Sequence, residues 1–206
     1  MSPAECPLFA GLKEERLHQA LKLLNASEKR YENGSVLKDA DTPLQAFGLV
    51  MEGRVQVSMT DIDGNLLLLS VVTPGHTFGE SLCYLQEDSP IRITADGDSR
   101  VLWLHCEGLR EDAELMRRFC GMLARRTLSM NDRIQAMSRP TLHDKLIAYF
   151  TQCERDTGSR SFDIPMDRAA LAAWLGTERS ALSRELSAMR RRGELNYRKN
   201  HFELLK

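Results

Sequence analysis

The sequence predicts an α+β fold in which a roll, barrel or sandwich of short strands precedes a long helix and a small helical unit. Two changes of periodicity and one proline carry this prediction. Short β-favouring runs fill residues 29–106, and a helical period without proline then continues through 109–137. Pro140 ends that helix, because proline disfavours helical geometry in the residue before it. We therefore expect three parts, at 1–108, 109–137 and 138–206.

The first element is helical. The segment PLFAGLKEERLHQALKLL at 7–24 spaces its leucines 12, 17, 21 and 24 as one face of a helix does. We expect one or two short amphipathic helices before the strands begin.

The next region alternates strands with turns. Glycines 34, 53, 64 and 75 end successive runs, where a turn needs a positive φ that glycine adopts at low cost. Many short strands at this spacing are typical of a barrel, roll or sandwich. The expected strands are SVLK, AFGLVM, RVQVSM, LLLLSVV, IRITA and RVLWLH.

The long helix carries an apolar seam in which steps of four and three residues alternate. That period suits a coiled coil, so we expect two copies of the helix to pair in a homodimer. The alternative is a single helix that packs this stripe on its own domain. The predicted dimer seam consists of Met116, Cys120, Leu123, Thr127, Met130, Ile134 and Met137.

After Pro140 the pattern predicts a trihelical unit with a wing. A helix TLHDKLIAYFTQCERDTG and a strand SFDIP precede two helices, DRAALAAWLG and TERSALSRELSAMRRRG, and a hairpin LNYRKNHFELLK. The two helices have the spacing of a helix-turn-helix. Ala172 gives a small side chain at the helix crossing, Gly176 permits the turn, and Thr177 is expected to cap the second helix. The expected shared core is Leu171, Leu175, Leu182 and Leu186.

The second of these helices has a polar outer face. With Leu182, Leu186 and Met189 inward, helical spacing puts Arg179, Ser180, Ser183 and Arg184 outward near its N-terminal end. That end of a recognition helix reaches base edges in the DNA major groove, where arginine can bond guanine bidentately. The alternative is a merely solvated face. Further expected DNA contacts, mainly to phosphate, are Thr177, Arg168, Arg190, Arg191, Arg192, Arg198 and Lys199.

Charge is divided unevenly along the chain. Residues 1–137 carry 15 basic and 20 acidic residues, a net −5, whereas 138–206 carry 13 and 9, a net +4. This asymmetry indicates that the C-terminal part meets a polyanion.

Other function classes find little support. No nucleotide-binding glycine pattern, G-x-S-x-G or H-E-x-x-H motif indicates an enzyme, and the five scattered cysteines form no metal-ligand pattern. One of them could still be a redox-sensing thiol. The longest nearly apolar run, LLLLSVV, is too short to span a membrane, and no signal peptide is visible, so we expect a cytoplasmic location.

Taken in order, these parts resemble the cyclic-AMP receptor protein/fumarate–nitrate regulator (CRP/FNR) family of bacterial transcription factors. The resemblance covers nearly the whole chain and rests on PLFAGL, the four glycines, PGHTFGES at 74–81, the long helix and SALSREL. It implies a double-stranded β-helix (a jelly-roll, cupin-like cyclic-nucleotide-binding fold), a dimerisation helix and a winged helix-turn-helix. It also implies a palindromic promoter site on double-stranded DNA and contact with RNA polymerase.

The family further implies a small-molecule effector bound between the β-roll and the long helix. In cyclic-AMP binders an Arg-Ser pair after the FGE turn holds the phosphate. Here Ser89 and Pro90 fall near those places and Arg92 is displaced, so we do not expect cyclic AMP. The expected effector pocket contains Phe78, Gly79, Glu80, Ser81, Leu82, Ser89, Arg92, Leu123 and Thr127.

The same resemblance leaves two alternatives to an unidentified effector, namely a redox- or haem-dependent sensor of this fold and a sensory module without a DNA role. Cys6 alone cannot hold the clustered-cysteine iron–sulfur centre of some relatives. His76, in a surface turn, is not expected to bind haem.

The reading helix also departs from the family. Many relatives have glutamate where Ser180 stands, while Arg184 takes the place of the guanine-contacting arginine. Because serine is less selective than a carboxylate, which accepts from cytosine, the preferred half-site is expected to differ.

Overall fold

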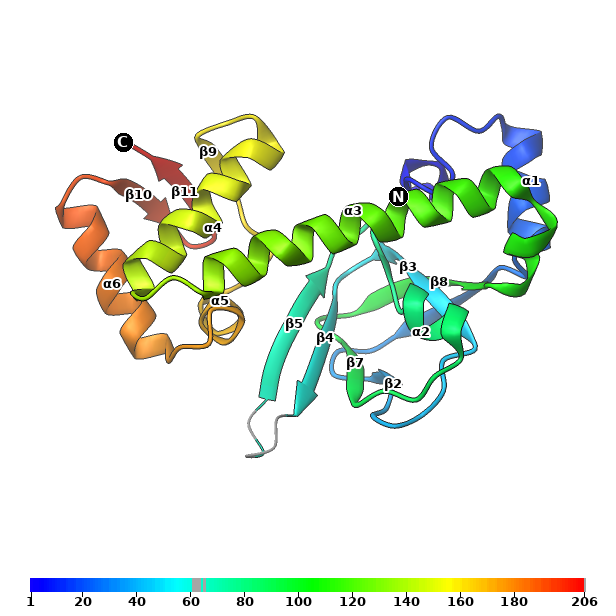
Figure 1. Ribbon diagram of the computed structural model, residues 1–206, viewed down its shortest axis with the longest axis horizontal. Helices are drawn as coiled ribbons and strands as arrows, with labels where there is room; N and C mark the ends of the chain where they lie inside the picture. Colours follow the sequence, from blue (N-terminus) through cyan, green and yellow to red (C-terminus); the bar gives the residue numbers. More distant parts are fainter. Residues whose placement is uncertain (61–63, 65, 206) are drawn as a thin grey trace. The chain divides into compact units, whose positions relative to one another are not determined.

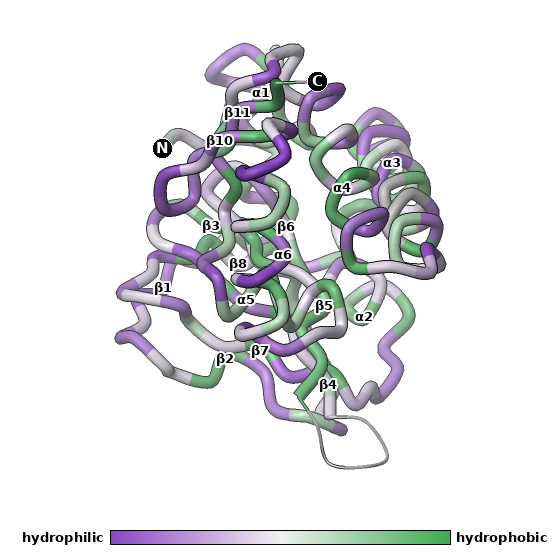
Figure 2. The backbone as a smooth tube through the Cα atoms, turned by 90° about the vertical axis from the view of Figure 1, so that its left-hand side faces the viewer, coloured by the Kyte–Doolittle hydropathy of each residue, from purple (hydrophilic) through white to green (hydrophobic). Residues whose placement is uncertain are grey.

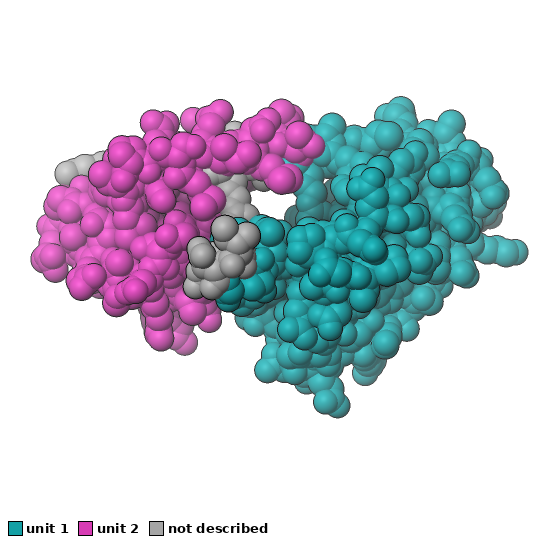
Figure 3. Space-filling view, turned by 60° about the horizontal axis from the view of Figure 1, so that its bottom comes forward, with its two compact units in different colours: residues 1–126 teal, residues 127–206 magenta. Residues whose placement is uncertain are grey.

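The computed structural model describes residues 1–60, 64 and 66–205, which form two compact units, 1–126 and 127–206 (Figure 3). The division falls within the long helix α3 (Ala113–Met137), so each unit contains part of it. The expected turn DIDGN lies, apart from Gly64, outside the described residues.

Two antiparallel four-stranded sheets make up the β-roll of the first unit (Figure 1). This confirms the predicted roll, and all six expected runs are strands. In one sheet the order is β1 (Ser27–Tyr31), β8 (Ser99–His105), β3 (Ala46–Glu52) and β6 (Thr77–Phe78). The other has β2 (Val36–Lys38), β7 (Ile91–Ala95), β4 (Val55–Thr60) and β5 (Leu66–Val72).

The central strand β3 is buried on both faces, which explains its uninterrupted apolar run. Ala46 and Val50 belong to the core between the sheets, whereas Phe47 and Leu49 belong to a second core that also contains residues of α1 and α3. The hydrophobic colouring of β3 contrasts with the hydrophilic colouring of β1 in Figure 2. Position 48 of β3 requires a glycine, because a Cβ atom there would overlap the Phe78 ring.

Helix α1 (Glu14–Leu23) precedes the roll, as predicted, and a short helix η1 (Pro3–Glu5), which lies before the predicted segment, precedes α1. The sequence did not reveal β1, β6, the helix α2 (Glu80–Leu85) or the short helix η2 (Glu107–Glu111). The reason is physical: β1, SEKRY, is mostly exposed and charged, and β6 and α2 are too short to show a period.

Along α3, two neighbouring stripes have different environments. Leu115, Phe119 and Met122 are buried in the core of the first unit. The predicted seam is displaced by one position from this stripe: Met116 and Leu123 are partly buried against that core, and Cys120 and Thr127 are exposed. Met130 and Ile134 are 59% and 61% exposed, and Met137 is half-buried.

The second unit is a trihelical bundle with a three-stranded sheet. Helices α4 (Leu142–Thr157), α5 (Arg168–Trp174) and α6 (Arg179–Arg191) accompany strands in the order β10 (Leu195–Arg198), β11 (His201–Leu204) and β9 (Ser161–Asp163). The hairpin β10–β11 is the predicted wing. Phe150, Phe162 and Phe202 pack together beneath it.

Candidate nucleic-acid interface and effector site

The turn between α5 and α6 has the geometry that the sequence predicted. Gly176 has φ +64°, and the Thr177 amide donates to the Ala172 carbonyl at 2.9 Å. Ala172 is 2% exposed, which permits the close crossing of the helices. The expected shared core of Leu171, Leu175, Leu182 and Leu186 is buried.

The predicted cap of α6 is wrong by one residue. The helix begins at Arg179, and its N-cap is Glu178, which has extended geometry and makes no side-chain cap hydrogen bond. Thr177 instead belongs to the turn, where its amide bonds back to α5. The turn backbone thus extends one residue further than capping preference indicates.

The outer face of α6 is polar and open. Arg179, Ser180, Ser183 and Arg184 are all exposed, opposite the buried Leu186 and Met189. Ser180 Oγ donates to Glu178 Oε2 at 3.3 Å. The helix therefore presents two arginines and two hydroxyls together near its N-terminal end.

Three further residues predicted to contact phosphate lie in different environments. Lys199 is exposed at the hairpin tip with φ +53°. Arg168 stacks its guanidinium over the rings of Tyr197 and Phe202, at 4.9 and 4.8 Å, and burial lowers its pKa. Arg192 pairs with Glu185 and Glu194, at 2.9 and 2.6 Å. The exposed Lys199 side chain can therefore reach a phosphate. Arg168 and Arg192 instead bind groups of the second unit itself.

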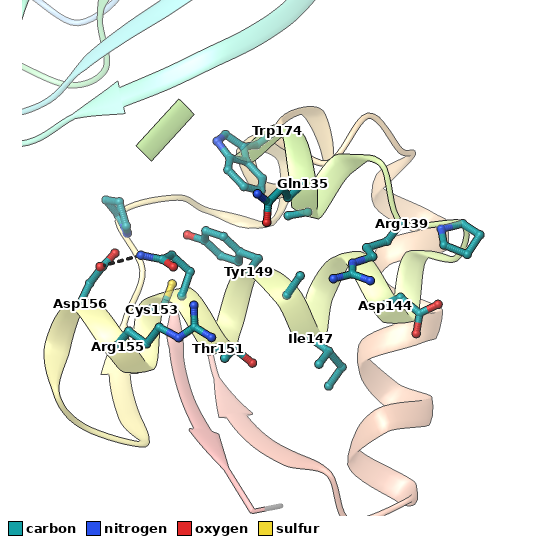
Figure 4. A pocket seen from close by; sticks show the side chains of 15 residues that line it. Gln135, Arg139, Asp144, Ile147, Tyr149, Thr151, Cys153, Arg155, Asp156 and Trp174 are labelled. Carbon is teal, nitrogen blue, oxygen red and sulfur yellow. Dashed lines mark hydrogen bonds between the residues drawn. The ribbon is translucent and has the colours of Figure 1, made fainter. Parts of the chain in front are cut away.

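A groove of about 890 Å³ also lies in the second unit, between the end of α3, α4 and α5. Figure 4 shows Tyr149 and Trp174 on its wall, with ring centroids 4.7 Å apart. Gln152 and Asp156 of α4 also line the groove, and Gln152 donates to Asp156 at 2.8 Å, so the groove is partly polar.

In the first unit, the expected effector residue Glu80 is engaged by an arginine. The Glu80 side chain is 5% exposed, and Arg126 of α3 donates to both of its carboxylate oxygens, at 2.6 and 2.8 Å. Arg126 also donates to the Thr77 carbonyl at 3.2 Å, and the Thr77 hydroxyl donates to Glu80. Arg126 was not among the expected effector residues, although it lies one helical turn beyond Leu123.

The loop that carries Ser89 is held by a buried lysine. Lys38 is 4% exposed, and its ammonium donates to the carbonyls of Asp39, Ser89 and Ile91 at 2.9–3.2 Å. Burial lowers the pKa of Lys38, while neighbouring aspartates act in the opposite direction. Nothing in the sequence pattern of a short strand signals such a lysine.

The other expected pocket residues are dispersed. Phe78 is fully buried against Trp103, Leu82 packs partly on the same core, and Gly79, with φ +78°, is the N-cap of α2. Ser81 is exposed, and Arg92 pairs with Asp39 at 3.3 Å on the surface. Glu80, by contrast, is directly hydrogen-bonded to Arg126 of α3.

No membrane-spanning helix and no group of three or more potential metal ligands occurs in the described part of the chain. His76 is exposed in its turn, with Nδ1 3.3 Å from the Thr73 hydroxyl.

Comparison with known proteins agrees with this architecture. Residues 28–111 match the cyclic nucleotide-binding domain, and 144–206 match the Crp-like helix-turn-helix domain. The cyclic AMP receptor protein of Thermus thermophilus is 27% identical over 195 residues, covering 91% of this chain and 87% of the relative.

Solved structures are similar as well. The catabolite activator protein of Thermus thermophilus has a TM-score of 0.53 at 26% identity, covering 96% of this chain and 93% of that one. FixK2 from Bradyrhizobium japonicum has a TM-score of 0.71 at 20% identity, covering 88% and 93%, and supports the fold alone.

A sensory β-roll joined by a long helix to a winged helix-turn-helix defines an effector-regulated DNA-binding protein. The chain belongs to the CRP/FNR family of transcription regulators. Members of this family are regulators rather than enzymes.

Proposed function

We propose that this regulator is a homodimer that reads a palindromic promoter site through the N-terminal end of α6. The observation that carries the proposal is the open face of Arg179, Ser180, Ser183 and Arg184 above a buried leucine core. Arginine suits the two acceptors of guanine, and the hydroxyls suit several bases. Arg191, Arg198 and Lys199, all exposed, supply phosphate contacts that hold the register.

Arg184→Ala tests the assignment of the reading helix. We expect affinity for the best duplex selected from a random pool to fall about 5- to 150-fold, with loss of preference at one base pair of each half-site. Arg191→Ala is the matched control: it should weaken all duplexes about equally, because a phosphate contact carries no sequence information. Unchanged affinity and preference in Arg184→Ala would show that α6 does not read the bases.

Ser180 is the residue that we expect to make the preferred DNA half-site of this chain differ from that of its relatives. Ser180→Glu should shift the selected half-site toward cytosine on one strand, because a carboxylate accepts from the cytosine amino group. The expected shift is measured in the same selection.

The homodimer rests on the second half of α3. Met130 and Ile134, at 59% and 61% exposure, continue the seam beyond the part that packs on the β-roll core. Exposed apolar residues in one stripe favour pairing with a second copy. A twofold dimer then presents two reading helices to two half-sites related by the same symmetry.

Ile134→Glu should dissociate the dimer, because it places a carboxylate in the apolar seam. Light scattering should report the monomer mass for this variant, whereas Gln135→Glu, its neighbour on α3, should remain dimeric. A dimer that persists in Ile134→Glu would move the interface away from the seam.

The effector is proposed to be a small molecule other than cyclic AMP. The regulator is proposed to act in the cytoplasm, where it and RNA polymerase meet DNA. Pro90, which has no amide hydrogen, stands where cyclic-AMP binders hold the phosphate. Lys38 binds the carbonyls of this loop, and Arg126 binds Glu80, so a nucleotide would have to replace contacts already made. The Thermus thermophilus relative is named for cyclic AMP, and we do not assign that ligand to this chain.

A further inference from the structure

Three cysteines that are far apart in the sequence belong to one buried hydrophobic core of the first unit. Cys6, Cys83 and Cys106 are 0%, 1% and 8% exposed and belong to the core that also contains residues of α1, β3 and α3. Cys106 follows β8 directly, whereas Cys83 lies in α2. All three are free thiols.

Strand register brings two of these thiols together. Ala46 pairs with His105 across β3 and β8, so Gln45 and Cys106 are the next residues on the two antiparallel chains. Cys83 Sγ donates to the Gln45 carbonyl oxygen at 3.4 Å, so the Cys83 side chain lies beside Cys106. The two thiols are thus neighbours within the core.

This proximity makes the two thiols chemically different. Because the two side chains interact, the pKa of Cys83 is lowered and that of Cys106 is raised. Burial raises the pKa of Cys6 to about 11, which keeps it a neutral thiol. The thiolate is the nucleophile, so Cys83 is the one of the three suited to react first.

We propose that Cys83 and Cys106 form a redox modification site, at which a hydroperoxide converts the two thiols into a disulfide. In the first step the Cys83 thiolate attacks one peroxide oxygen, the O–O bond breaks, and a sulfenic acid forms as the other oxygen leaves as water or an alcohol. In the second step Cys106 sulfur attacks the Cys83 sulfur, the S–S bond forms, and water leaves with the Cys106 proton. Both sulfurs are oxidised and both peroxide oxygens are reduced.

The position of this pair gives the disulfide a structural effect. Cys83 lies three residues after Glu80, and Cys106 is the N-cap of η2, which leads into α3. A bond between them would close the segment 83–106 into a loop that contains Ser89 and Arg92. Oxidation would thus restrain the segment in which we expect the effector to bind.

Treatment of the full-length wild-type protein with hydrogen peroxide tests the proposal. After denaturation and alkylation, peptide mass spectrometry should find Cys83 linked to Cys106 with the loss of two hydrogens, and dithiothreitol should reverse it. Cys6 should remain alkylated. A sample denatured before the peroxide treatment serves as the standard that shows the oxidant was active.

Variants separate this pair from the third buried thiol. Cys6→Ala should leave the link intact, whereas Cys83→Ala and Cys106→Ala should each abolish it. The proposal is overturned if both thiols remain alkylated in the folded protein at a peroxide dose that oxidises the denatured protein, or if the link joins either of them to Cys6. Since the wild-type result is decisive by itself and needs no DNA, poor folding of a variant or failure of DNA binding does not affect it.

Discussion

Glu80 in the β-roll and Arg184 on α6 are both charged residues of proposed binding sites, yet they have opposite environments. Glu80 is buried, and Arg126 and Thr77 already occupy its carboxylate. Arg184 is exposed on a helix whose opposite face is a rigid leucine core. A ligand at Glu80 must therefore displace contacts, whereas DNA can meet α6 without rearrangement inside the second unit.

This difference suits a regulator. A buried ion pair that a ligand can replace gives a two-state element on which an effector can act, because only differential contacts shift a conformational equilibrium. In the proposed mode of action, the preformed face of α6 keeps sequence preference constant while the effector changes the population of binding-competent molecules.

The largest expected effect comes from removing the support of the reading face. Leu186 is 1% exposed, so Leu186→Ala should lower the free energy of unfolding of the second unit by about 2–5 kcal/mol. Urea denaturation measures this change. Ser183→Ala, on the exposed face, should change stability by less than about 0.5 kcal/mol. Comparable losses of stability in both variants would mean that the two faces of α6 do not differ in burial.

Arg126→Met tests whether Glu80 depends on its partner. Removing one member of a buried pair costs about 3–5 kcal/mol, and because Arg126 is 38% exposed we expect about 2 kcal/mol in the first unit. Denaturant unfolding of that unit measures it.

Two variants control this result. Adding Glu80→Gln to Arg126→Met should restore much of the loss, because it removes the unpaired charge. Arg92→Met, which breaks the exposed pair with Asp39, should cost less than about 1 kcal/mol. If Arg126→Met lowers the free energy of unfolding no more than Arg92→Met does, the Glu80–Arg126 pair does not behave as a buried ion pair.

The smallest expected effect is a pH dependence within the second unit. Glu194 accepts from His143 Nε2 at 2.9 Å and raises the pKa of His143, an effect that Asp144 increases. A raised folded-state pKa stabilises the protein fully below the unfolded value of about 6.5. The stabilisation is lost as pH rises through the folded-state value.

His143→Gln should therefore lower stability by less than about 1 kcal/mol at about pH 5.5 and by little at about pH 8, since the pair is partly exposed. Thermal unfolding across this range measures the difference. Glu194→Gln should remove the same His143-linked change, and an unaltered pH profile in both variants would exclude this pair as its source.

Much of the architecture was predictable because it depends on local patterns. Glycines at run ends, the change from strand to helix period and Pro140 predicted the roll, the long helix and the end of that helix. The helix-turn-helix followed from Ala172, Gly176 and the spacing of buried leucines. The Thr177 cap was wrong because the tertiary turn overrode a capping preference.

The missed features depend on contacts between distant residues. Arg126 looks like any charged residue on a long helix, and Lys38 like any lysine at a strand end. Their partners, Glu80 and the carbonyls of Ser89 and Ile91, reach them only after the strands and helices have packed. The periodicity of the sequence therefore cannot predict such pairings.

By itself, therefore, the sequence determined the order of the elements and the face of α6 that is exposed, because helix and strand periods assign each residue to a side. Only the tertiary structure decided which charges are already satisfied and which thiols are neighbours. Burial and strand register determine both, and they bring together residues as distant as Glu80 and Arg126, or Cys83 and Cys106.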